Sequence, residues 1–532
     1  MRLPTAAVTA GVLLLAGIMA ADLLPWIRSG GLHIALEGSH VEVWYLGRML
    51  TELRAEPRGK LTCFNACAAV YESSSAKAVV EASGSLLKVV VSSGAGWAGV
   101  SCRVSGGLLW APCGLPPSRE LRWPLRYRLE LYIPLVVYYW PSRDVGFTLC
   151  CPPWSRLPSL SFRLSEGVLE ARVENLARGR QVEFWLIPHR GGPMSGLLLY
   201  LAEAGMEPSL RGELAGAWWC TDPYNITVEN LELARRLGVK VIELHQYFPY
   251  YGLYAPQAES WLDEYDRPES WSLLREKVRL AKRYGMTVLV YIDLAECQHH
   301  VALRDFASSL CLSRDGKPVR GIWRRDWRRQ TYLVNCDPSL EFGAYLLEQA
   351  RALLERIPEA DGLFADRADY SIVDYAHSDG VTEVEGMPCY TYSFAVERLL
   401  LELRRQLKGK LLVVNLPVTV EAVLLADAVS RDYTESLEPY KTVYQSMLKP
   451  CYLLYVGEDF QMRQLENLKL YTRLGALPGL DNRYLPCKLH VDGWRRAARS
   501  SLSEIMWRAE VIPALEALRL PWRCRPGFSA SS

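Results

Sequence analysis

The feature that most constrains the fold is a series of eight short apolar runs in the second part of the chain, each ending in polar residues. These runs occupy residues 216–222, 239–247, 287–296, 361–369, 411–417, 427–435, 451–459 and 474–481. Helical patterns separate or follow them, at residues 226–237, 271–284, 338–356, 390–407, 418–426, 439–448, 460–472 and 491–518. Eight strand–helix units in about 300 residues match a (β/α)8 TIM barrel in number and length. We therefore predict such a barrel for residues 212–518.

One helical segment, SWSLLREKVRLAKRYG, carries a signal at each end. Ser270 suits the N-cap position, and Gly285 stands where a glycine commonly ends a helix. A doubly wound open sheet is the alternative architecture. No G-x-G-x-x-G motif follows the first apolar run, and this disfavours the alternative.

The preceding part of the chain, residues 31–200, has a different pattern of apolar and polar residues. Short alternating runs such as YRLELYIPLVVYYW and LSFRLSEGVLEARVEN are separated by clusters of Gly, Pro, Ser and charged residues. This pattern is typical of an antiparallel β-sandwich. A chain of 532 residues is too long for one ordinary core, so the sequence predicts a multidomain β plus α/β protein: a β-sandwich, then the barrel, then a tail at 519–532.

The first 25 residues contain an apolar segment from Ala6 to Ala21 that follows a single arginine. Its length and flanks predict a signal peptide or an N-terminal membrane anchor, with a buried first helix as the alternative. We therefore expect an extracellular protein, or one on the outer face of the cell membrane. Fourteen cysteines fit an oxidising compartment and disulfides, and Cys63 and Cys67 are close enough in sequence to bridge.

Composition excludes some partners and leaves others open. The formal net charge is only +2, so no basic field indicates nucleic acid. The chain has 17 Trp and 28 Tyr, whose flat faces suit sugar stacking and equally suit an ordinary β-rich core.

Polar and aromatic side chains collect where the predicted barrel strands end, which is where TIM barrels assemble their active sites. In chain order they are Trp218, Trp219, Asp222, Glu243, His245, Gln246, Tyr250, Asp293, Glu296, Asp366, Arg367, Asp369, Asn415, Arg431, Asp432, Glu435 and Asp481. Two carboxylates that flank a scissile bond are the minimal apparatus of glycoside hydrolysis. The sequence therefore predicts a glycoside hydrolase that acts on an oligo- or polysaccharide.

The run PSLEFGAYLLEQARALLERIPEADGLFADRADY, residues 338–370, resembles the third-helix and fourth-strand region of the α-galactosidase and α-glucosidase assemblage. That resemblance implies a β-sandwich before the barrel and a retaining mechanism on an α-linked sugar. It implies that Asp366 is the nucleophile and that Asp432, or else Glu435, is the acid/base. Phe364 stands where the α-galactosidase pattern has lysine, so the resemblance implies a glycosidase without specifying its sugar.

The remaining candidates receive binding roles. Hydroxyl binding is expected of Asp222, His245, Asp293 and Asn415, and ring stacking of Trp218, Trp219 and Tyr250. Arg367, Asp369, Arg431 and Asp481 complete the expected substrate site. Because proton transfer and a carboxylate suffice for this chemistry, no cofactor and no metal are expected.

Three alternatives stay open at this point. Asp366 could be an ion-pair partner of Arg367 or Arg431 instead of a nucleophile. The whole chain could be a non-catalytic carbohydrate-binding or cell-surface protein on a degenerate barrel. It could also be a metal-dependent hydrolase or lyase that uses Asp293, Glu296, His299 and His300.

Overall fold

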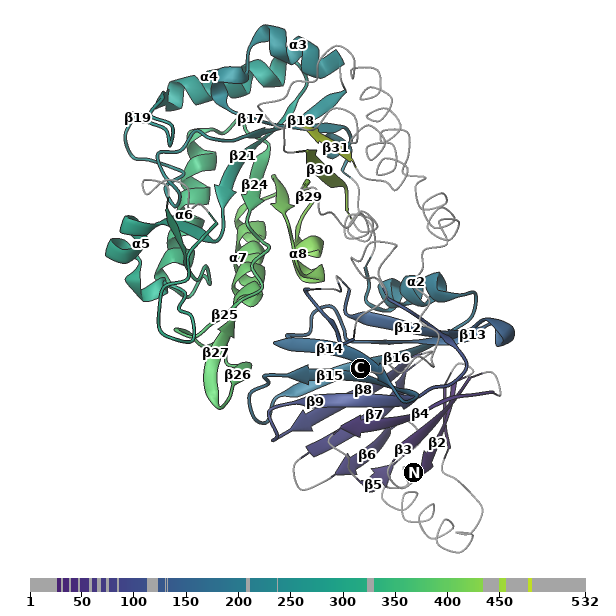
Figure 1. Cartoon of the computed structure of the whole chain (residues 1–532). Coiled ribbons are helices and arrows are strands. Elements are labelled where there is room, and N and C mark those ends of the chain that lie inside the picture. The colour runs from purple at the N-terminus through teal and green to yellow at the C-terminus, as the bar shows by residue number, and fades with distance from the viewer. Residues whose placement is uncertain are drawn as a thin grey trace, which may run out of the picture.

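The computed structural model describes most of the chain. The described residues are 26–433, except 30–31, 38–39, 46–47, 57–59, 65–67, 73–75, 84–85, 112–122, 130, 132, 207–210, 237 and 323–329, together with 449–455 and 477–480. Two eight-stranded antiparallel sheets and one closed barrel dominate the described part (Figure 1). The multidomain β plus α/β organisation predicted from the sequence is confirmed.

The first sheet has the strand order β1-β2-β3-β4-β9-β15-β14-β11. Its strands are β1 (Trp26–Ser29), β2 (Leu32–Glu37), β3 (His40–Tyr45), β4 (Arg48–Glu56), β9 (Ala98–Arg103), β11 (Leu125–Arg126), β14 (Ser159–Ser165) and β15 (Val168–Glu174). Strand β15 shows why these segments form a sheet, because its residues alternate between buried and more exposed positions. Buried Ala171 pairs with Phe162 of β14 on one side and with Val100 of β9 on the other.

The second sheet has the order β10-β12-β13-β16-β8-β7-β6-β5. Its strands are β5 (Lys60–Phe64), β6 (Ala68–Glu72), β7 (Ala76–Ser83), β8 (Leu86–Ser93), β10 (Leu108–Trp110), β12 (Leu135–Trp140), β13 (Val145–Cys150) and β16 (Gln181–His189). Strands β8 and β16 contact β9 of the first sheet, so the two sheets share a core. Helix α2 (Pro193–Glu203) packs on β12, β13 and β16.

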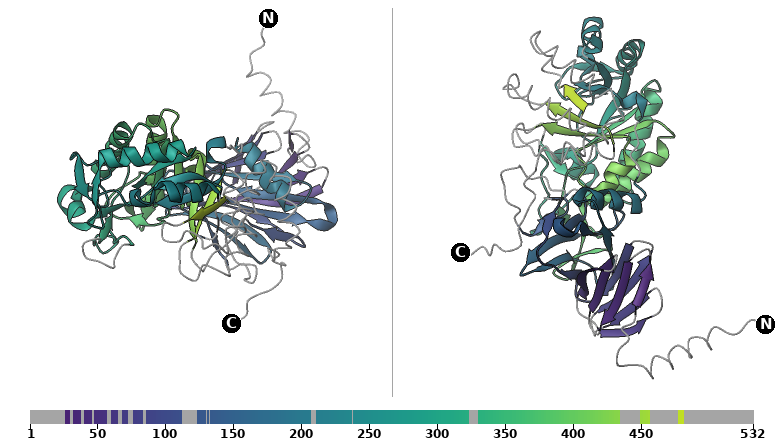
Figure 2. Two further views of the ribbon diagram at one scale, coloured as in Figure 1. Left: turned by 90° about the horizontal axis from the view of Figure 1, so that it is seen from above. Right: turned by 90° about the vertical axis from the view of Figure 1, so that its right-hand side faces the viewer.

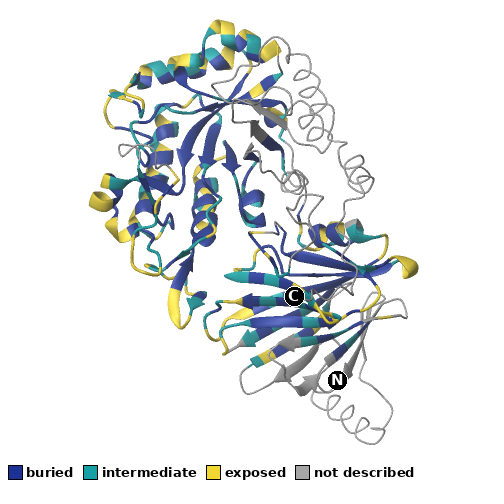
Figure 3. Ribbon diagram, in the orientation of Figure 1, coloured by how far each residue is buried: buried dark blue, intermediate teal, exposed yellow. Residues whose placement is uncertain are grey.

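The barrel contains eight parallel strands, and β31 pairs with β17 to close it. The strands are β17 (Ala217–Thr221), β18 (Val239–Leu244), β21 (Thr287–Asp293), β24 (Gly362–Asp366), β28 (Leu411–Asn415), β29 (Ala428–Tyr433), β30 (Cys451–Tyr455) and β31 (Leu477–Leu480). Each lies within one of the eight apolar runs that the sequence identified. Figure 3 shows that the strands from β17 to β28 are almost entirely buried, which accounts for their continuous apolar character.

Helices connect successive barrel strands where the sequence predicted them. They are α3 (Val228–Arg236), α4 (Trp271–Arg283), α6 (Glu341–Arg356), α7 (Tyr392–Gln406) and α8 (Val420–Leu425). In α4 the Ser270 side chain accepts a hydrogen bond from the amide of Leu273, and Gly285 follows the helix with a φ of 74°. The predicted helices at 439–448, 460–472 and 491–518 lie outside the described residues.

Smaller elements complete the described structure, mostly in the barrel part of the chain. They are α5 (His299–Asp305), β19 (Ser260–Leu262), β20 (Pro268–Ser270), β22 (Glu296–Gln298), β23 (Thr331–Leu333), β25 (Val373–Asp374), β26 (Thr382–Val384), β27 (Met387–Thr391), and the 3-10 turns η1 (Pro141–Arg143), η2 (Gly212–Leu214), η3 (Pro223–Asn225) and η4 (Ala307–Ser309). Most belong to the loops that follow β17, β18, β21 and β24. The long insertions therefore stand at the carboxyl end of the barrel strands.

The hairpin of β26 and β27 joins the barrel to the sandwich. The amide of Ala177 donates to the carbonyl of Val381 at 2.7 Å, and the amide of Glu383 donates to the carbonyl of Asn175 at 2.9 Å. Figure 1 shows this hairpin reaching from the barrel toward the ends of the sandwich strands, and Figure 2 shows the barrel and the sandwich next to each other in two further views. The hairpin follows β24, so the sandwich anchors the loop that leaves the fourth barrel strand.

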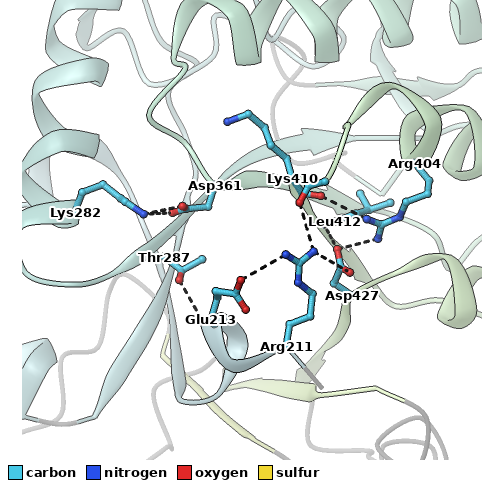
Figure 4. Close-up of polar contacts among 10 residues, drawn as sticks. Arg211, Glu213, Lys282, Thr287, Asp361, Arg404, Lys410, Leu412 and Asp427 are labelled. Atoms are coloured by element: carbon cyan, nitrogen blue, oxygen red, sulfur yellow. Dashed lines mark hydrogen bonds and ion pairs between the residues drawn. The ribbon is translucent and has the colours of Figure 1, made fainter. Parts of the chain in front are cut away.

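A polar network closes the amino end of the barrel (Figure 4). Lys282 contacts both oxygens of Asp361 at 2.6 and 2.8 Å. Asp427 accepts hydrogen bonds from Arg404 at 2.9 Å and from the amide of Leu412 at 2.8 Å. These carboxylates precede β24 and β29, so each ties the start of a strand to a neighbouring element.

Two other expectations concern segments that the structure covers only in part. Residues 1–25 are not among the described residues, and within the described part no helix is long and apolar enough to cross a bilayer. Nine cysteines whose side chains are described are free thiols, including the adjacent Cys150 and Cys151. No disulfide is present among these nine, and the side chains of Cys63 and Cys67 lie outside the described part.

Candidate active site

The barrel interior is filled by aromatic rings below its carboxyl end. Trp218 of β17 stacks on Phe364 of β24 with ring centroids 5.1 Å apart, and it lies 5.9 Å from Tyr452 of β30. All three residues are at most 1% exposed. Asp366 comes two residues after Phe364 and lies on the same face of β24. These rings thus form an apolar layer directly below the strand-end residues.

Asp366 ends β24 and is partly exposed. Its Oδ2 accepts a hydrogen bond from the Tyr291 hydroxyl at 2.8 Å, and its Oδ1 accepts one from the Asn415 amide at 2.8 Å. The backbone amide of Arg367 also donates to Oδ1, at 2.7 Å. Three donors from three adjacent strand ends therefore fix the orientation of one carboxylate. Within the described part of the chain, Asp366 has no ion-pair partner.

The Arg367 side chain points away from Asp366, and its backbone adopts a strained conformation. Its φ is 66°, in the left-handed region that a non-glycine residue rarely adopts. Its guanidinium lies 3.2 Å from Asp369 and 3.6 Å from Glu296, and it covers the ring of Tyr370 at 4.5 Å. Arg367 therefore pairs with two other carboxylates, while Asp366 is held by neutral donors.

Positive φ recurs at the ends of neighbouring strands. Leu416 follows β28 with a φ of 54°, and Gln246 lies two residues after β18 with a φ of 52°. Such conformations cost free energy and persist where the surrounding structure holds them, often at functional sites. The mouth of the barrel is therefore locally strained at three of its strands.

Asp293 ends β21, Glu296 begins β22, and both side chains are fully buried. Oδ1 of Asp293 accepts the amides of Ala295 and Glu296 at 2.8 and 2.9 Å, and its Oδ2 has no hydrogen-bond partner among the described residues. Burial, then Glu296 and Asp366, raise the pKa of Asp293 well above its ordinary value. Glu296 accepts hydrogen bonds from the hydroxyls of Thr331 and Tyr370. Burial and the two neighbouring carboxylates therefore favour the protonated form of Asp293, and Glu296 anchors the loop.

Asp369 is the second partly exposed carboxylate in this loop. Burial raises its pKa to about 6, and the neighbouring Arg367 opposes this rise. A carboxyl group with such a pKa is poised to exchange a proton near neutral pH. Asp369 therefore interacts electrostatically with Asp366 and titrates in a range that suits proton transfer.

His245 follows β18 and faces the same interior. Its Nδ1 lies 2.7 Å from Oε1 of Glu243, and its ring centroid is 3.9 Å from that of Tyr291. Burial lowers the pKa of His245, but the hydrogen bond and charge of Glu243 outweigh it and the net shift is upward. Burial raises the pKa of Glu243, and His245 opposes that change. The two groups therefore form a hydrogen-bonded pair beside Tyr291, whose hydroxyl holds Asp366.

A hydrogen-bond chain leads from Asp366 toward the sixth strand. Asn415 donates to Asp366 through Nδ2, and its Oδ1 accepts the hydroxyl of Ser430 in β29 at 2.8 Å. Asp432 lies two residues further along β29, and its backbone pairs in register with Leu454 of β30. The structure thus brings the strand of the predicted acid/base close to that of the predicted nucleophile. The side chain of Asp432, and all of Glu435 and Asp481, lie outside the described part.

The other predicted site residues have defined places. Trp219 is fully buried, as Trp218 is. Asp222 caps the turn η3 by accepting the amide of Asn225 at 3.0 Å and pairs with Arg267 at 2.9 Å. Tyr250 is partly buried and lies 6.3 Å from the ring of His300. Arg431 is buried in β29 beside Cys451, where its charge acts on the thiol.

The predicted alternative metal set is not brought together as ligands. Nδ1 of His299 lies 3.2 Å from the carbonyl of Gln330, and His300 turns toward Tyr250. Among the described residues, the group with ligand spacing consists of Cys220, Glu243 and His245.

Sequence reasoning missed Tyr291 and Tyr370 and gave Glu243 no role. Tyr291 precedes Asp293 by two residues in the run TVLVYID, so strand alternation places both on one face. That parity is the signal by which Tyr291 could have been found. Tyr370 carries no such signal, because its position follows from the turn at Arg367.

Comparison with known proteins identifies the fold. No protein-family model matches the chain, and no curated protein matches its sequence. A solved α-N-acetylgalactosaminidase, NagBb from Bifidobacterium bifidum, superposes with a TM-score of 0.58 at 9% identity, over 92% of this chain and 94% of the other. A GH31 family sulfoquinovosidase from E. rectale gives 0.57 at 10% identity, over 91% and 84%. A GH36 α-galactosidase, AgaA from Geobacillus stearothermophilus, gives 0.56 at 10% identity, over 91% and 86%.

These likenesses cover both the sandwich and the barrel, because nine-tenths of the chain takes part. At such low identity they establish the fold and not the activity. The resemblance expected from residues 338–370 is confirmed: this chain has the fold of glycoside hydrolases of the α-galactosidase group.

Proposed function

We propose that the chain is a glycoside hydrolase that cleaves α-linked sugars by a retaining mechanism with two carboxylates. The observation that carries the proposal is the state of Asp366. It is a partly exposed carboxylate at the mouth of the barrel, held by Tyr291 and Asn415 and free of any ion pair within the described residues. If Asp366 only served to close the barrel, we would expect its carboxylate to form an ion pair with Arg367.

In the proposed first step, Asp366 attacks the anomeric carbon of the substrate. Asp432, or alternatively Glu435, protonates the leaving oxygen, so that a covalent glycosyl-enzyme forms and the aglycone departs. In the second step the same acid/base removes a proton from water, which displaces the sugar from Asp366 with net retention. Tyr291 and Asn415 keep the carboxylate aligned for the attack.

Binding of the sugar falls to the polar groups around Asp366. Asp369 and the hydrogen-bonded His245–Glu243 pair offer acceptors and donors for hydroxyls. Asp222, Tyr250, Arg431 and Asp481 stay predicted substrate contacts, whereas the buried Trp218 and Trp219 do not present a face for sugar stacking. The neighbours in fold are named for α-galactose, N-acetylgalactosamine and sulfoquinovose substrates, and we propose an α-linked sugar for this chain on that basis.

Export is the remaining part of the proposal. The apolar segment from Ala6 to Ala21 supports an extracellular location or attachment to the outer face of the membrane. A protein with this location would meet oligo- or polysaccharides directly.

The test is a panel of aryl α- and β-glycosides with the wild type and Asp366→Asn. We expect hydrolysis of at least one α-glycoside and near-complete loss in the variant. Proton NMR of the first sugar released should show the α anomer, which is the retained configuration. Equal rates for Asp366→Asn and wild type would refute the assignment of the nucleophile, and release of the β anomer would refute retention. Sugar binding without hydrolysis of any member would favour the non-catalytic alternative.

A further inference from the structure

Cys220, Glu243 and His245 form a compact group beside the proposed active site. Cys220 lies in β17 and pairs in register with Glu243 of β18, and the amide of His245 donates to the carbonyl of Thr221 at 2.8 Å. One sulfur, one carboxylate oxygen and one ring nitrogen lie within 4.8 Å of one another. Adjacent parallel strands thus bring three different ligand types to one point.

The chemistry of these ligands selects the cation. A thiolate and an imidazole suit borderline-soft ions such as Zn²⁺, whereas Mg²⁺ and Ca²⁺ prefer sets made of oxygens alone. Three protein ligands leave the fourth tetrahedral position of Zn²⁺ open. The group therefore resembles a site for a single Zn²⁺ with one exchangeable ligand.

Glu243 gives an independent indication that an ion fits here. Its side chain is 2% exposed, and only Oε1 contacts His245. Its Oε2 makes no hydrogen bond of normal geometry within the described part, although the Cys220 thiol is close enough to lower the pKa of Glu243. A buried carboxylate oxygen without a good partner is costly, and coordination would satisfy it.

The surrounding charge also favours a cation. The negatively charged side chains of Asp366 and Glu264 interact electrostatically with His245, as Glu243 does. A Zn²⁺ ion at this point would take the place of the protons bound to its three ligands. Its binding releases those protons to solvent and involves no change of oxidation state.

We propose that Cys220, Glu243 and His245 bind one Zn²⁺ ion and that this ion inhibits hydrolysis. The ring of His245 packs on Tyr291, whose hydroxyl holds Asp366. A cation at the group would attract the Asp366 carboxylate and remove His245 from sugar binding. The inhibition rests on the proposed glycosidase function, but the binding of Zn²⁺ does not.

The binding is tested on the full chain with Co²⁺ and Zn²⁺. Co²⁺ bound to a thiolate gives a ligand-to-metal charge-transfer absorption, and Zn²⁺ should compete it away. We expect this band in the wild type and its loss in Cys220→Ser, with at least about tenfold weaker Zn²⁺ binding in equilibrium dialysis. The matched control is Cys389→Ser in β27, a buried cysteine whose Sγ contacts the carbonyl of Met387 at 3.2 Å. Equal Zn²⁺ affinity in wild type and Cys220→Ser would overturn the site.

The inhibition is tested with the aryl glycoside that the wild type hydrolyses. Zn²⁺ should inhibit the wild type and Cys389→Ser, EDTA should reverse this, and Cys220→Ser should keep its basal rate and resist the ion. Equal inhibition of all three proteins would overturn the inhibitory role. If no glycoside is cleaved, the proposed function fails, while the Co²⁺ and Zn²⁺ measurements still decide whether the site exists.

Discussion

The two ends of the barrel differ in how well their charged side chains are paired. At the amino end, Asp361 and Asp427 are each held by a cationic side chain and by a backbone amide (Figure 4). At the carboxyl end, buried Asp293 and Glu243 each have an oxygen that lacks a hydrogen bond among the described residues. Arg367 pairs with Glu296 and Asp369 there, and its Nε also lacks an aligned partner among the described residues.

This difference indicates that charged groups stabilise the fold at the amino end of the barrel and destabilise it at the carboxyl end. Paired charges at the starts of strands fix the barrel, whereas unsatisfied carboxylates at the strand ends raise the free energy of the folded state. Natural proteins keep such arrangements at sites where chemistry needs them. Asp361 and Asp366, at the two ends of one strand, show a related contrast, because Asp361 pairs with a lysine whereas Asp366 is held by neutral donors.

The largest expected effect comes from Asp366→Asn. Loss of the attacking carboxylate should lower kcat by about 10⁴-fold or more, while the amide keeps the size of the side chain. Steady-state kinetics with an aryl α-glycoside measures this. The matched control is Asp361→Asn, which removes a carboxylate from the start of the same strand. It should keep kcat within about threefold and lower the melting temperature, because the change does not touch the mouth. A comparable fall of kcat in both variants would contradict the claim that only the carboxyl end of the barrel takes part in catalysis.

The second effect concerns stability at the base. Asp427→Ala leaves the amide of Leu412 without its acceptor and breaks the ion pair with Arg404, whose guanidinium keeps the carbonyl of Leu425. We expect a loss of about 2 kcal/mol in the free energy of unfolding, because a buried amide loses its partner and the ion pair is broken. Urea denaturation measures this, and kcat of the folded enzyme should not change. A variant as stable as the wild type would show that the base network contributes nothing.

The third effect concerns the donors to Asp366. Tyr291→Phe removes one hydrogen bond to the carboxylate while it keeps the ring that packs on His245. Hydrogen bonds to charged groups contribute about 1.5–3 kcal/mol, so kcat should fall roughly 10- to 100-fold with little change in KM. Tyr247→Phe is the control, because that hydroxyl donates to the carbonyl of Tyr291 and does not touch Asp366. Equal kcat values for Tyr291→Phe and wild type would remove Tyr291 from the positioning role.

The smallest effect is a pH-dependent one in the loop that follows β18. Glu269 is 2% exposed, neither of its oxygens has a hydrogen-bond partner within the described residues, and burial raises its pKa to about 8. Between the ordinary value of 4.5 and about 8, the folded state binds a proton that the unfolded state has released. The stability of the wild type should therefore fall as pH rises through this window.

Glu269→Gln removes that titration. It should raise the free energy of unfolding by on the order of 1–2 kcal/mol at pH 9 and by much less at pH 4.5. Thermal melting of both proteins across this range checks the difference. A stabilisation that is the same at both pH values would show that ionisation of the buried Glu269 carboxyl does not destabilise the folded state.

Periodicity predicted the barrel well, because a buried parallel strand must be apolar and must end where it meets solvent. All eight barrel strands fall within the runs identified from the sequence, and the Ser270 and Gly285 helix signals act as expected. The position of Asp366 at the end of the fourth strand followed from the same pattern.

The contacts of the site could not be read in this way. Which donor reaches Asp366 depends on the register of β21, β24 and β28 and on the length of the Tyr291 side chain. The pairing of Arg367 with Asp369 and Glu296 depends on a left-handed residue that no propensity specifies. Likewise, Trp218 appears in the sequence as an aromatic at a strand end, and only the stacking with Phe364 shows that it fills the barrel.

The most direct test of the central claim is to trap the covalent intermediate. An activated fluorinated α-glycoside that forms the glycosyl-enzyme quickly and releases it slowly should add one sugar to the wild type. Mass spectrometry of the digested protein should then place this sugar on Asp366, and Asp361→Asn should be labelled equally. Labelling of Asp432, Glu435 or any other carboxylate, with Asp366 unmodified, would contradict the account.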